Sequence, residues 1–273
     1  GCPACVHSSS VKESGVFDWR GGVMPPARMD GFLSSYAPFA AQIYFYNFGE
    51  PLLNPRTPDF VSRAKRMMTS TVISSSLSIS KLNAEALVSS GLDLLTVSID
   101  GVSQETYERF RRGGDLARVF ENIEKIVKAK RNLRRDTPIL NWQFLQFEHN
   151  RHERNTVLTR ARELGMNKVT FGVPYEVDWD DPSIQIAQDA RFAVEKIDTP
   201  HHYLRENTRA VLPPGMAPEE AWDIEATNNA FDRAFLPRDV DPDVIDQRPP
   251  ERQPCSWLHK NMVVDANGRV LTC

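Results

Sequence analysis

Four cysteines are the residues best suited to chemistry in this sequence of 273 residues. Cys2 and Cys5 form a Cys-Pro-Ala-Cys motif, and Cys255 and Cys273 lie 250 or more residues further along the chain. Such separated thiols are typical of metal or redox sites in a reducing compartment rather than of a dense disulfide framework. The spacing alone leaves four interpretations open: iron–sulfur ligation, a zinc site formed by all four cysteines, a redox dithiol, or thiols without a chemical role.

A glycine and a carboxylate follow an apolar segment at residues 41–47. Gly49, Glu50 and Pro51 interrupt this segment sharply, and the glycine permits a close approach of the backbone to a ligand. The Glu50 carboxylate is suited to binding a ligand ammonium group. The alternative for an isolated Gly-Glu-Pro is a turn with a solvated glutamate.

Two later apolar segments also end in polar residues. Ser98 and Asp100 lie at the end of residues 94–99, where they are suited to hydrogen-bond a pair of ribose hydroxyls. The alternative is a turn in which Asp100 caps the following helix. Gln146 and Asn150 lie at the end of residues 139–147, and a polar group inside a barrel usually serves a ligand or a hydrogen-bond network.

The elements that must position these residues alternate along the first 174 residues. Apolar or β-branched segments predict strands at residues 41–47, 71–79, 94–99, 139–147 and 168–173. Helical spacing and caps predict helices at residues 27–36, 58–68, 83–91, 115–127 and 153–164. This alternation predicts an α/β fold, a partial (β/α)6 TIM-like barrel with one further strand before Cys2. Ligands of such folds bind at the carboxyl ends of the strands.

Composition changes near residue 175. Residues 175–254 carry 18 Asp and Glu against 8 Lys and Arg, together with ten of the 19 prolines, and we expect them to form an acidic connecting segment. We therefore expect three parts, 1–174, 175–254 and 255–273. The net charge of −3 gives no indication of nucleic-acid binding. No apolar segment is long enough to span a bilayer and no signal peptide opens the chain, so we expect a cytoplasmic protein.

The order of these motifs resembles the radical SAM family of enzymes. Cys2 and Cys5 are similar to part of its CxxxCxxC motif, and residues 47–53 resemble its Gly-Glu-Pro-Leu-Leu segment. Residues 97–101, with Glu105–Tyr107 and Arg111–Gly114 after them, resemble its fourth-strand region, and residues 147–150 resemble the exit of its fifth strand. Cys255, twelve residues, Gly268, four residues and Cys273 resemble the start of the SPASM extension, with a hairpin expected around Asn267-Gly268.

The resemblance implies a [4Fe–4S] cluster and S-adenosylmethionine. Cys2 and Cys5 would be the second and third cluster ligands, and the first would lie four residues before Cys2. The positions implied to bind S-adenosylmethionine are Gly49, Glu50 and Pro51 for the methionine amino group, Ser98 and Asp100 for the ribose, and Gln146 and Asn150 for the remainder. The implied reaction is reductive cleavage to a 5′-deoxyadenosyl radical, which abstracts a hydrogen atom from the substrate.

The resemblance also implies partners and an auxiliary cluster. Cys255 and Cys273 would be two ligands of an auxiliary [4Fe–4S] cluster. The implied substrate is a peptide or protein, with a sugar or small metabolite as the alternative and a non-catalytic zinc-binding scaffold as a third possibility. An electron donor such as flavodoxin or ferredoxin is implied, and neither nucleic acid nor membrane. Because the chain begins with Gly1-Cys2 and stops on Cys273, we expect it to be a fragment.

Overall fold

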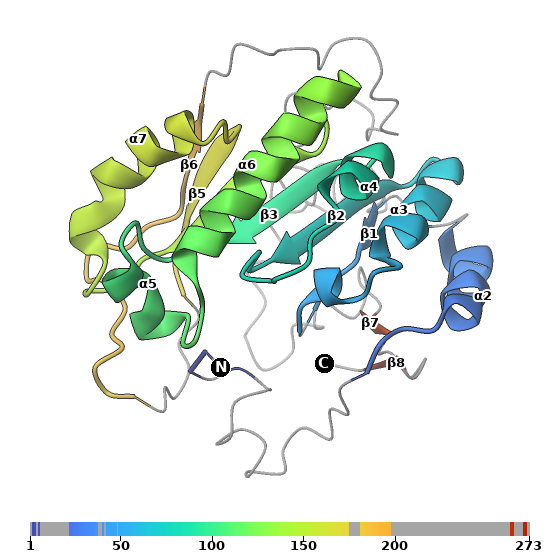
Figure 1. The fold of residues 1–273 in the computed structure, drawn as a ribbon. Helices are drawn as coiled ribbons and strands as arrows, with labels where there is room; N and C mark the ends of the chain where they lie inside the picture. Colours follow the sequence, from blue (N-terminus) through green and yellow to red (C-terminus); the bar gives the residue numbers. More distant parts are fainter. Residues whose placement is uncertain are drawn as a thin grey trace, which may run out of the picture.

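A computed structural model describes residues 2–3, 5, 22–37, 40, 42–47, 49–174, 181–197, 263–264 and 270–271. Strands and helices alternate through the long central range, as the sequence predicts (Figure 1). The elements are α2 (Pro26–Tyr36), β1 (Gln42–Tyr44), η2 (Pro51–Leu53), α3 (Thr57–Arg66), β2 (Ser70–Ser75), α4 (Ala84–Ser89), β3 (Leu94–Ser98), α5 (Gln104–Phe110), α6 (Leu116–Leu133), β4 (Ile139–Leu145), η3 (Arg151–Glu153), α7 (Arg154–Glu163), β5 (Lys168–Gly172), β6 (Ala193–Lys196), β7 (Val263–Val264) and β8 (Val270–Leu271).

The strands form one six-stranded sheet in sequence order, β1-β2-β3-β4-β5-β6. The first five strands are parallel, so each pair is joined by a crossover connection, and β6 is antiparallel to β5. All five predicted strands are present. The open, mostly parallel α/β sheet matches the expected partial barrel, but β6 lies in the segment predicted to be only a connection. The short β7–β8 pair confirms the strands of the predicted hairpin, while its turn is outside the described residues.

Local sequence signals explain where the helices begin. Asn83 and Asp115, both predicted caps, accept hydrogen bonds from the backbone N–H of Ala86 and of Arg118. Helix α5 was not predicted, although Ser103 caps it by accepting from the N–H of Thr106. This helix has only seven residues, too few to show a clear 3.6-residue period.

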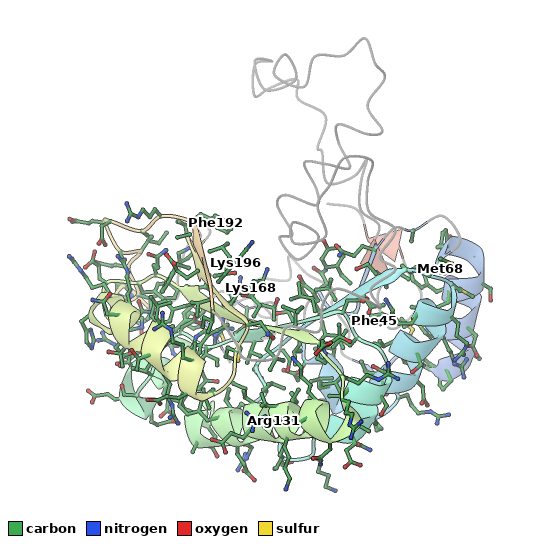
Figure 2. The ribbon with its side chains drawn as sticks, turned by 90° about the horizontal axis from the view of Figure 1, so that it is seen from above. Phe45, Met68, Arg131, Lys168, Phe192 and Lys196 are labelled. Carbon is green, nitrogen blue, oxygen red and sulfur yellow. The ribbon has the colours of Figure 1, made fainter. Side chains whose placement is uncertain are left out.

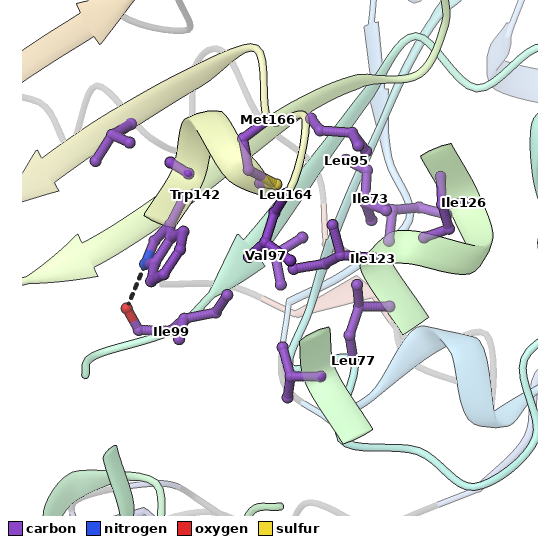
Figure 3. Packing of buried hydrophobic residues seen from close by; sticks show 14 of the residues in the cluster. Ile73, Leu77, Leu95, Val97, Ile99, Ile123, Ile126, Trp142, Leu164 and Met166 are labelled. Atoms are coloured by element: carbon purple, nitrogen blue, oxygen red, sulfur yellow. Dashed lines mark hydrogen bonds between the residues drawn. The ribbon is translucent and has the colours of Figure 1, made fainter. Parts of the chain in front are cut away.

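The main core lies between the sheet and the helices that cover one of its faces. The predicted apolar stripe of α6 faces this core: Val119, Ile123 and Ile126 have no exposed surface, and Phe120 packs beside them. Figure 3 shows Ile123 and Ile126 packed toward the side chains of the sheet. Trp142 is also fully buried there, and its indole N–H donates to the carbonyl of Ile99 at 2.7 Å. This bond ties the exit of β3 to the middle of β4.

The helices α3 to α7 lie on one side of the sheet. Its other face carries none of these helices. Figure 2 shows Arg131 of α6 on the helical side, with Lys168 of β5 and Lys196 of β6 on the opposite side. We call this second surface the concave face. None of the helices in the described ranges is both long and apolar enough to cross a membrane.

Candidate functional site

The carboxyl ends of the parallel strands gather the residues that the sequence singled out. Because neighbouring parallel strands point the same way, the segments after β1, β2, β3 and β4 meet at one edge of the sheet. The described part of the N-terminal segment, with Cys2 and Cys5, also lies at this edge, next to α5 (Figure 1). The predicted site residues that the structure describes therefore lie at one edge of the sheet.

The two N-terminal cysteines lie on a single turn. The backbone N–H of Cys5 donates to the carbonyl of Cys2 at 3.2 Å, and both side chains are half-buried free thiols. Cys2 packs against the apolar cluster of Phe110, Phe147 and Ile184. One face of the turn is thus held by α5 and by the exit of β4.

Glu50 is half-buried, and hydrogen bonds fix the orientation of its carboxylate. Its Oε1 accepts from the Ser75 hydroxyl at 2.7 Å and from the N–H of Leu52 at 3.2 Å. Its Oε2 accepts from both the N–H and the hydroxyl of Ser76 at 2.8 Å. The alternative of a turn with a solvated glutamate is therefore wrong for this residue. Four donors from its own turn and from the end of β2 fix the carboxylate in one orientation.

The residues on either side of Glu50 fit this arrangement. Gly49 has φ of 102°, a conformation that disfavours side chains, and Pro51 begins the 3-10 turn η2. Glu50 itself caps that turn through Leu52. The Gly-Glu-Pro sequence thus supplies a positive φ, a fixed carboxylate and an abrupt turn at three consecutive positions.

Asp100 forms a buried ion pair. It has no exposed surface, its Oδ2 lies 2.5 Å from Nε of Arg111, and its Oδ1 accepts from the N–H of Leu145 at 2.8 Å. It does not cap α5, so the capping alternative is wrong. Arg111 also reaches the cysteine turn, because its Nη1 lies 3.9 Å from Sγ of Cys2. Burial lowers the pKa of Arg111, but Asp100, Cys2 and Tyr107 together outweigh it and raise that pKa above its usual value.

The remaining predicted residues hold loops together. Ser98 donates to Oε1 of Gln143 at 3.4 Å across β3 and β4. The Gln146 side chain donates to the carbonyls of Gly172 and Arg191 at 3.3 and 2.7 Å. Asn150 is fully buried, accepts from the N–H of Phe147 and donates to the carbonyls of Asp100 and Leu145. The side chains of Gln146 and Asn150 are therefore engaged with backbone groups.

Sequence reasoning gave no role to Arg111, Tyr107, Ser75 or Ser76, which complete the site. Tyr107 is fully buried, and its hydroxyl has no hydrogen-bond partner in the described part of the chain. Burial raises its pKa to about 12, and Asp100, Cys2 and Glu50 act in the same direction while Arg111 opposes them. The motif containing Tyr107 and Arg111 was visible in the sequence, but not what the two side chains contact.

The described residues fit part of an iron–sulfur site. Two thiols on one turn are suitable ligands, and the Arg111 guanidinium beside Cys2 favours the negative charge of a metal-bound thiolate. Within the described ranges, no three His, Cys, Asp or Glu side chains gather into a metal site. Cys255 and Cys273, predicted as ligands of a second cluster, lie outside the described residues.

Comparison with known proteins gives one family match. The family model described as the Radical SAM superfamily matches residues 1–139. A comparison with curated proteins finds no match.

Similar solved structures include native anSMEcpe with bound AdoMet, with 17% identity, a TM-score of 0.48, and coverage of 67% of this chain and 52% of that one. Others are TYW1 with a lysine-pyruvate adduct bound (12%, 0.40, 52% and 45%) and coproporphyrinogen III oxidase (HemN) from Escherichia coli (14%, 0.42, 58% and 42%). The chain spans about half the length of these structures.

Proposed function

The chain belongs to the radical SAM superfamily of enzymes, and from this we propose a [4Fe–4S]-dependent enzyme that cleaves S-adenosylmethionine and abstracts a hydrogen atom from a peptide or protein. One observation carries the proposal: the Cys2–Cys5 turn, the fixed carboxylate of Glu50 and the Asp100–Arg111 pair converge at one edge of the sheet. When bound, the reduced cluster supplies the electron that cleaves S-adenosylmethionine to a 5′-deoxyadenosyl radical.

In this proposal the protein's own residues bind and orient. Cys2 and Cys5 hold two irons, and Arg111 offsets the negative charge of the thiolates. Glu50, with Gly49 and Pro51 shaping its turn, accepts hydrogen bonds from the methionine ammonium group. A carboxylate whose orientation is already fixed loses little rotational freedom on binding that group, which favours affinity.

The β3 exit forms the second half of the proposed cofactor site. Ser98 and the loop at Asp100 contact the ribose. Gln146 and Asn150 act by holding the neighbouring backbone, because their amide groups are already bonded to it. The buried Tyr107 side chain excludes water from the Asp100–Arg111 pair, which strengthens that interaction.

The C-terminal part is a further proposal, and most of its residues, including Cys255 and Cys273, lie outside the described ranges. We propose that residues 1–174 and strand β6 form the barrel, that the rest of 175–254 connects it, and that 255–273 begin a SPASM extension. Cys255 and Cys273 would hold an auxiliary cluster, and a flavodoxin or ferredoxin would supply electrons. Iron and sulfide analysis of the full-length protein tests this, since two [4Fe–4S] clusters require about eight irons per chain. Zinc without sulfide would instead support a zinc-binding scaffold.

The cofactor assignment is tested by Glu50→Ala. In the reconstituted full-length enzyme we expect formation of 5′-deoxyadenosine to be abolished, because the methionine ammonium group loses its carboxylate partner. Glu85→Ala, at an exposed position of α4, is the matched control and should keep wild-type formation. Undiminished 5′-deoxyadenosine from Glu50→Ala, measured by chromatography after addition of dithionite, rules out the assignment of Glu50.

A further inference from the structure

The two faces of the central sheet have opposite chemical character. On the helical side, strands β3 to β5 present buried apolar residues: Leu95, Val97, Leu140, Trp142, Phe144, Val169 and Phe171. Parallel sheets are usually apolar on both faces. On the concave face, the alternate positions of the same strands are mostly polar: five neutral residues lie there together with the buried Lys168 of β5, at a cost that only hydrogen bonding can offset.

The register aligns these polar residues in two rows. Thr96 pairs with Asn141, and Ser98 pairs with Gln143, which in turn pairs with Thr170. We call these five residues the polar band. Below them, toward the amino ends of the strands, Val72, Leu94 and Ile139 form a small apolar cluster. Above them lies the Asp100 loop of the candidate site, so the polar band runs from the site into the concave face.

Hydrogen bonds within the polar band occupy some of its donors and acceptors and leave others available. Both ends of the Asn141 side chain are engaged, since its amide nitrogen donates to Thr96 at 3.4 Å and its Oδ1 accepts from the Thr170 hydroxyl at 2.9 Å. Gln143 uses its Oε1 to accept from Ser98. In the described ranges its amide nitrogen has no protein partner, and the Thr170 oxygen has donated its proton but can still accept.

The accessible members of the polar band therefore offer a donor and an acceptor side by side. Gln143 and Thr170 are half-buried, whereas Thr96, Ser98 and Asn141 are at most 8% exposed. Adjacent strands lie about 4.8 Å apart, so the free donor of one strand lies beside the free acceptor of the next. One residue of an extended peptide presents the complementary pair on one side, because its own N–H and C=O point the same way.

We propose that the polar band is a substrate-binding surface that recognises one residue of an extended peptide, with Gln143 donating to its C=O and Thr170 accepting from its N–H. The inference rests on the proposed function, because it places the substrate beside the cofactor site. Gln143 is then a specificity-determining residue. Its neighbour Ser98 links the polar band to the residues proposed to contact the ribose.

The test uses saturation-transfer NMR on the full-length protein, with N-acetylglycine N-methylamide as the probe and methyl α-glucoside as the comparison. We expect the capped amino acid to be bound by the wild-type protein. Binding should fall about fivefold in Gln143→Leu, as for one lost neutral hydrogen bond. Thr170→Val, which keeps the side-chain shape, should weaken binding about threefold. Gln185→Leu makes the same chemical change as Gln143→Leu at an exposed position outside the polar band and should bind like the wild type.

Two outcomes overturn the inference: equal probe binding by Gln143→Leu and Gln185→Leu, or saturation of methyl α-glucoside in place of the capped amino acid. Formation of 5′-deoxyadenosine by the wild-type enzyme is measured separately. If that cleavage is absent, the proposed function fails. If cleavage is present and the variants bind the probe normally, only the assignment of the polar band fails.

Discussion

Two buried aspartates at opposite ends of β3 each form an ion pair, but the surroundings of the two pairs differ. Asp93, at the amino end, accepts hydrogen bonds from the Lys65 ammonium group at both carboxylate oxygens, at 2.8 and 2.7 Å. It also accepts from the N–H and the hydroxyl of Thr71. Asp100, at the carboxyl end, is bonded to Arg111 and Leu145. Both are ion pairs in the interior, but only the second includes a cation that reaches a cysteine.

The difference shows how one strand serves stability at one end and function at the other. Around Asp93 every contact joins elements of the scaffold, namely α3, β2 and the start of β3. Around Asp100 the contacts join the exit of β3 to the end of β4 and the end of α5, and the Arg111 guanidinium extends beyond its partner toward Cys2. Buried ion pairs contribute little net stability compared with apolar packing. A pair that also positions a cation beside a thiol has a functional reason to be there.

Removing each carboxylate is the strongest test of this contrast. Asp100→Asn leaves Arg111 in the interior without a charged partner, and we expect a loss of about 3–5 kcal/mol in the free energy of unfolding. Asp93→Asn should cost less, about 1–3 kcal/mol, because the Lys65 side chain is 27% exposed and its ammonium group can turn to water. Urea denaturation measures both values.

The same two variants separate stability from function. Calorimetric titration with S-adenosylmethionine, on reconstituted protein well below its unfolding temperature, should show weakened binding for Asp100→Asn alone. The comparison breaks down if Asp93→Asn loses as much affinity as Asp100→Asn, since both ends of β3 would then influence the site equally.

Substituting one glycine near each aspartate tests the same contrast, with smaller expected effects. A Cβ on Gly101 would lie 2.5 Å from the backbone nitrogen of Tyr107, so α5 would have to move with Tyr107 and Arg111. Gly101→Ala should therefore cost about 2–3 kcal/mol and weaken S-adenosylmethionine binding. Gly91, near Asp93, has φ of 80°, and its Cβ would meet only the flexible Lys65 side chain at 3.5 Å.

For that reason Gly91→Ala should cost about 1–2 kcal/mol, through its backbone conformation alone. Its affinity for S-adenosylmethionine should equal that of the wild-type protein. Thermal unfolding and the same titration check both variants. Unchanged affinity in a folded Gly101→Ala protein would show that the position of α5 does not control the site.

The sequence was informative where one local rule dominated. Continuous apolar segments located all five parallel strands, and Asn83 and Asp115 marked helix starts that the structure bears out. Gly49–Pro51 and Asp100 were identified from their positions after strands. These signals act over a few residues and need no knowledge of the tertiary contacts.

The rest depended on contacts between distant residues. Nothing near Glu50 in the chain indicates that Ser75 and Ser76 hold its carboxylate, and nothing near Asp100 indicates which of several arginines pairs with it. Strand β6 was missed because residues 193–196 form a short edge strand inside an acidic, proline-rich segment. Such a strand is specified by its pairing with β5 and not by its own composition.

The carboxyl end should also differ from the amino end in its response to acid, which is the smallest effect expected. The His149 ring is stacked on Phe147 at 5.4 Å, and neither ring nitrogen has a hydrogen-bond partner in the described ranges. Burial lowers its pKa to about 4, helped by Arg109 and His152 and opposed by Glu153. The unfolded chain, with a pKa near 6.5, binds a proton earlier as the pH falls. Stability should therefore decrease from pH 6.5 toward pH 4.

His149→Phe keeps the stack on Phe147 but has no group that titrates. Its unfolding temperature should fall less steeply between pH 6.5 and pH 4 than that of the wild-type protein, and the two curves should run parallel above pH 7. His152→Phe, at an exposed position three residues away, is the control and should retain most of the wild-type slope, because His152 has the smallest influence on the pKa of His149. If His149→Phe and the wild type lose stability at the same rate, the acid sensitivity arises elsewhere. The carboxyl end then contributes no more to it than the Asp93 end does.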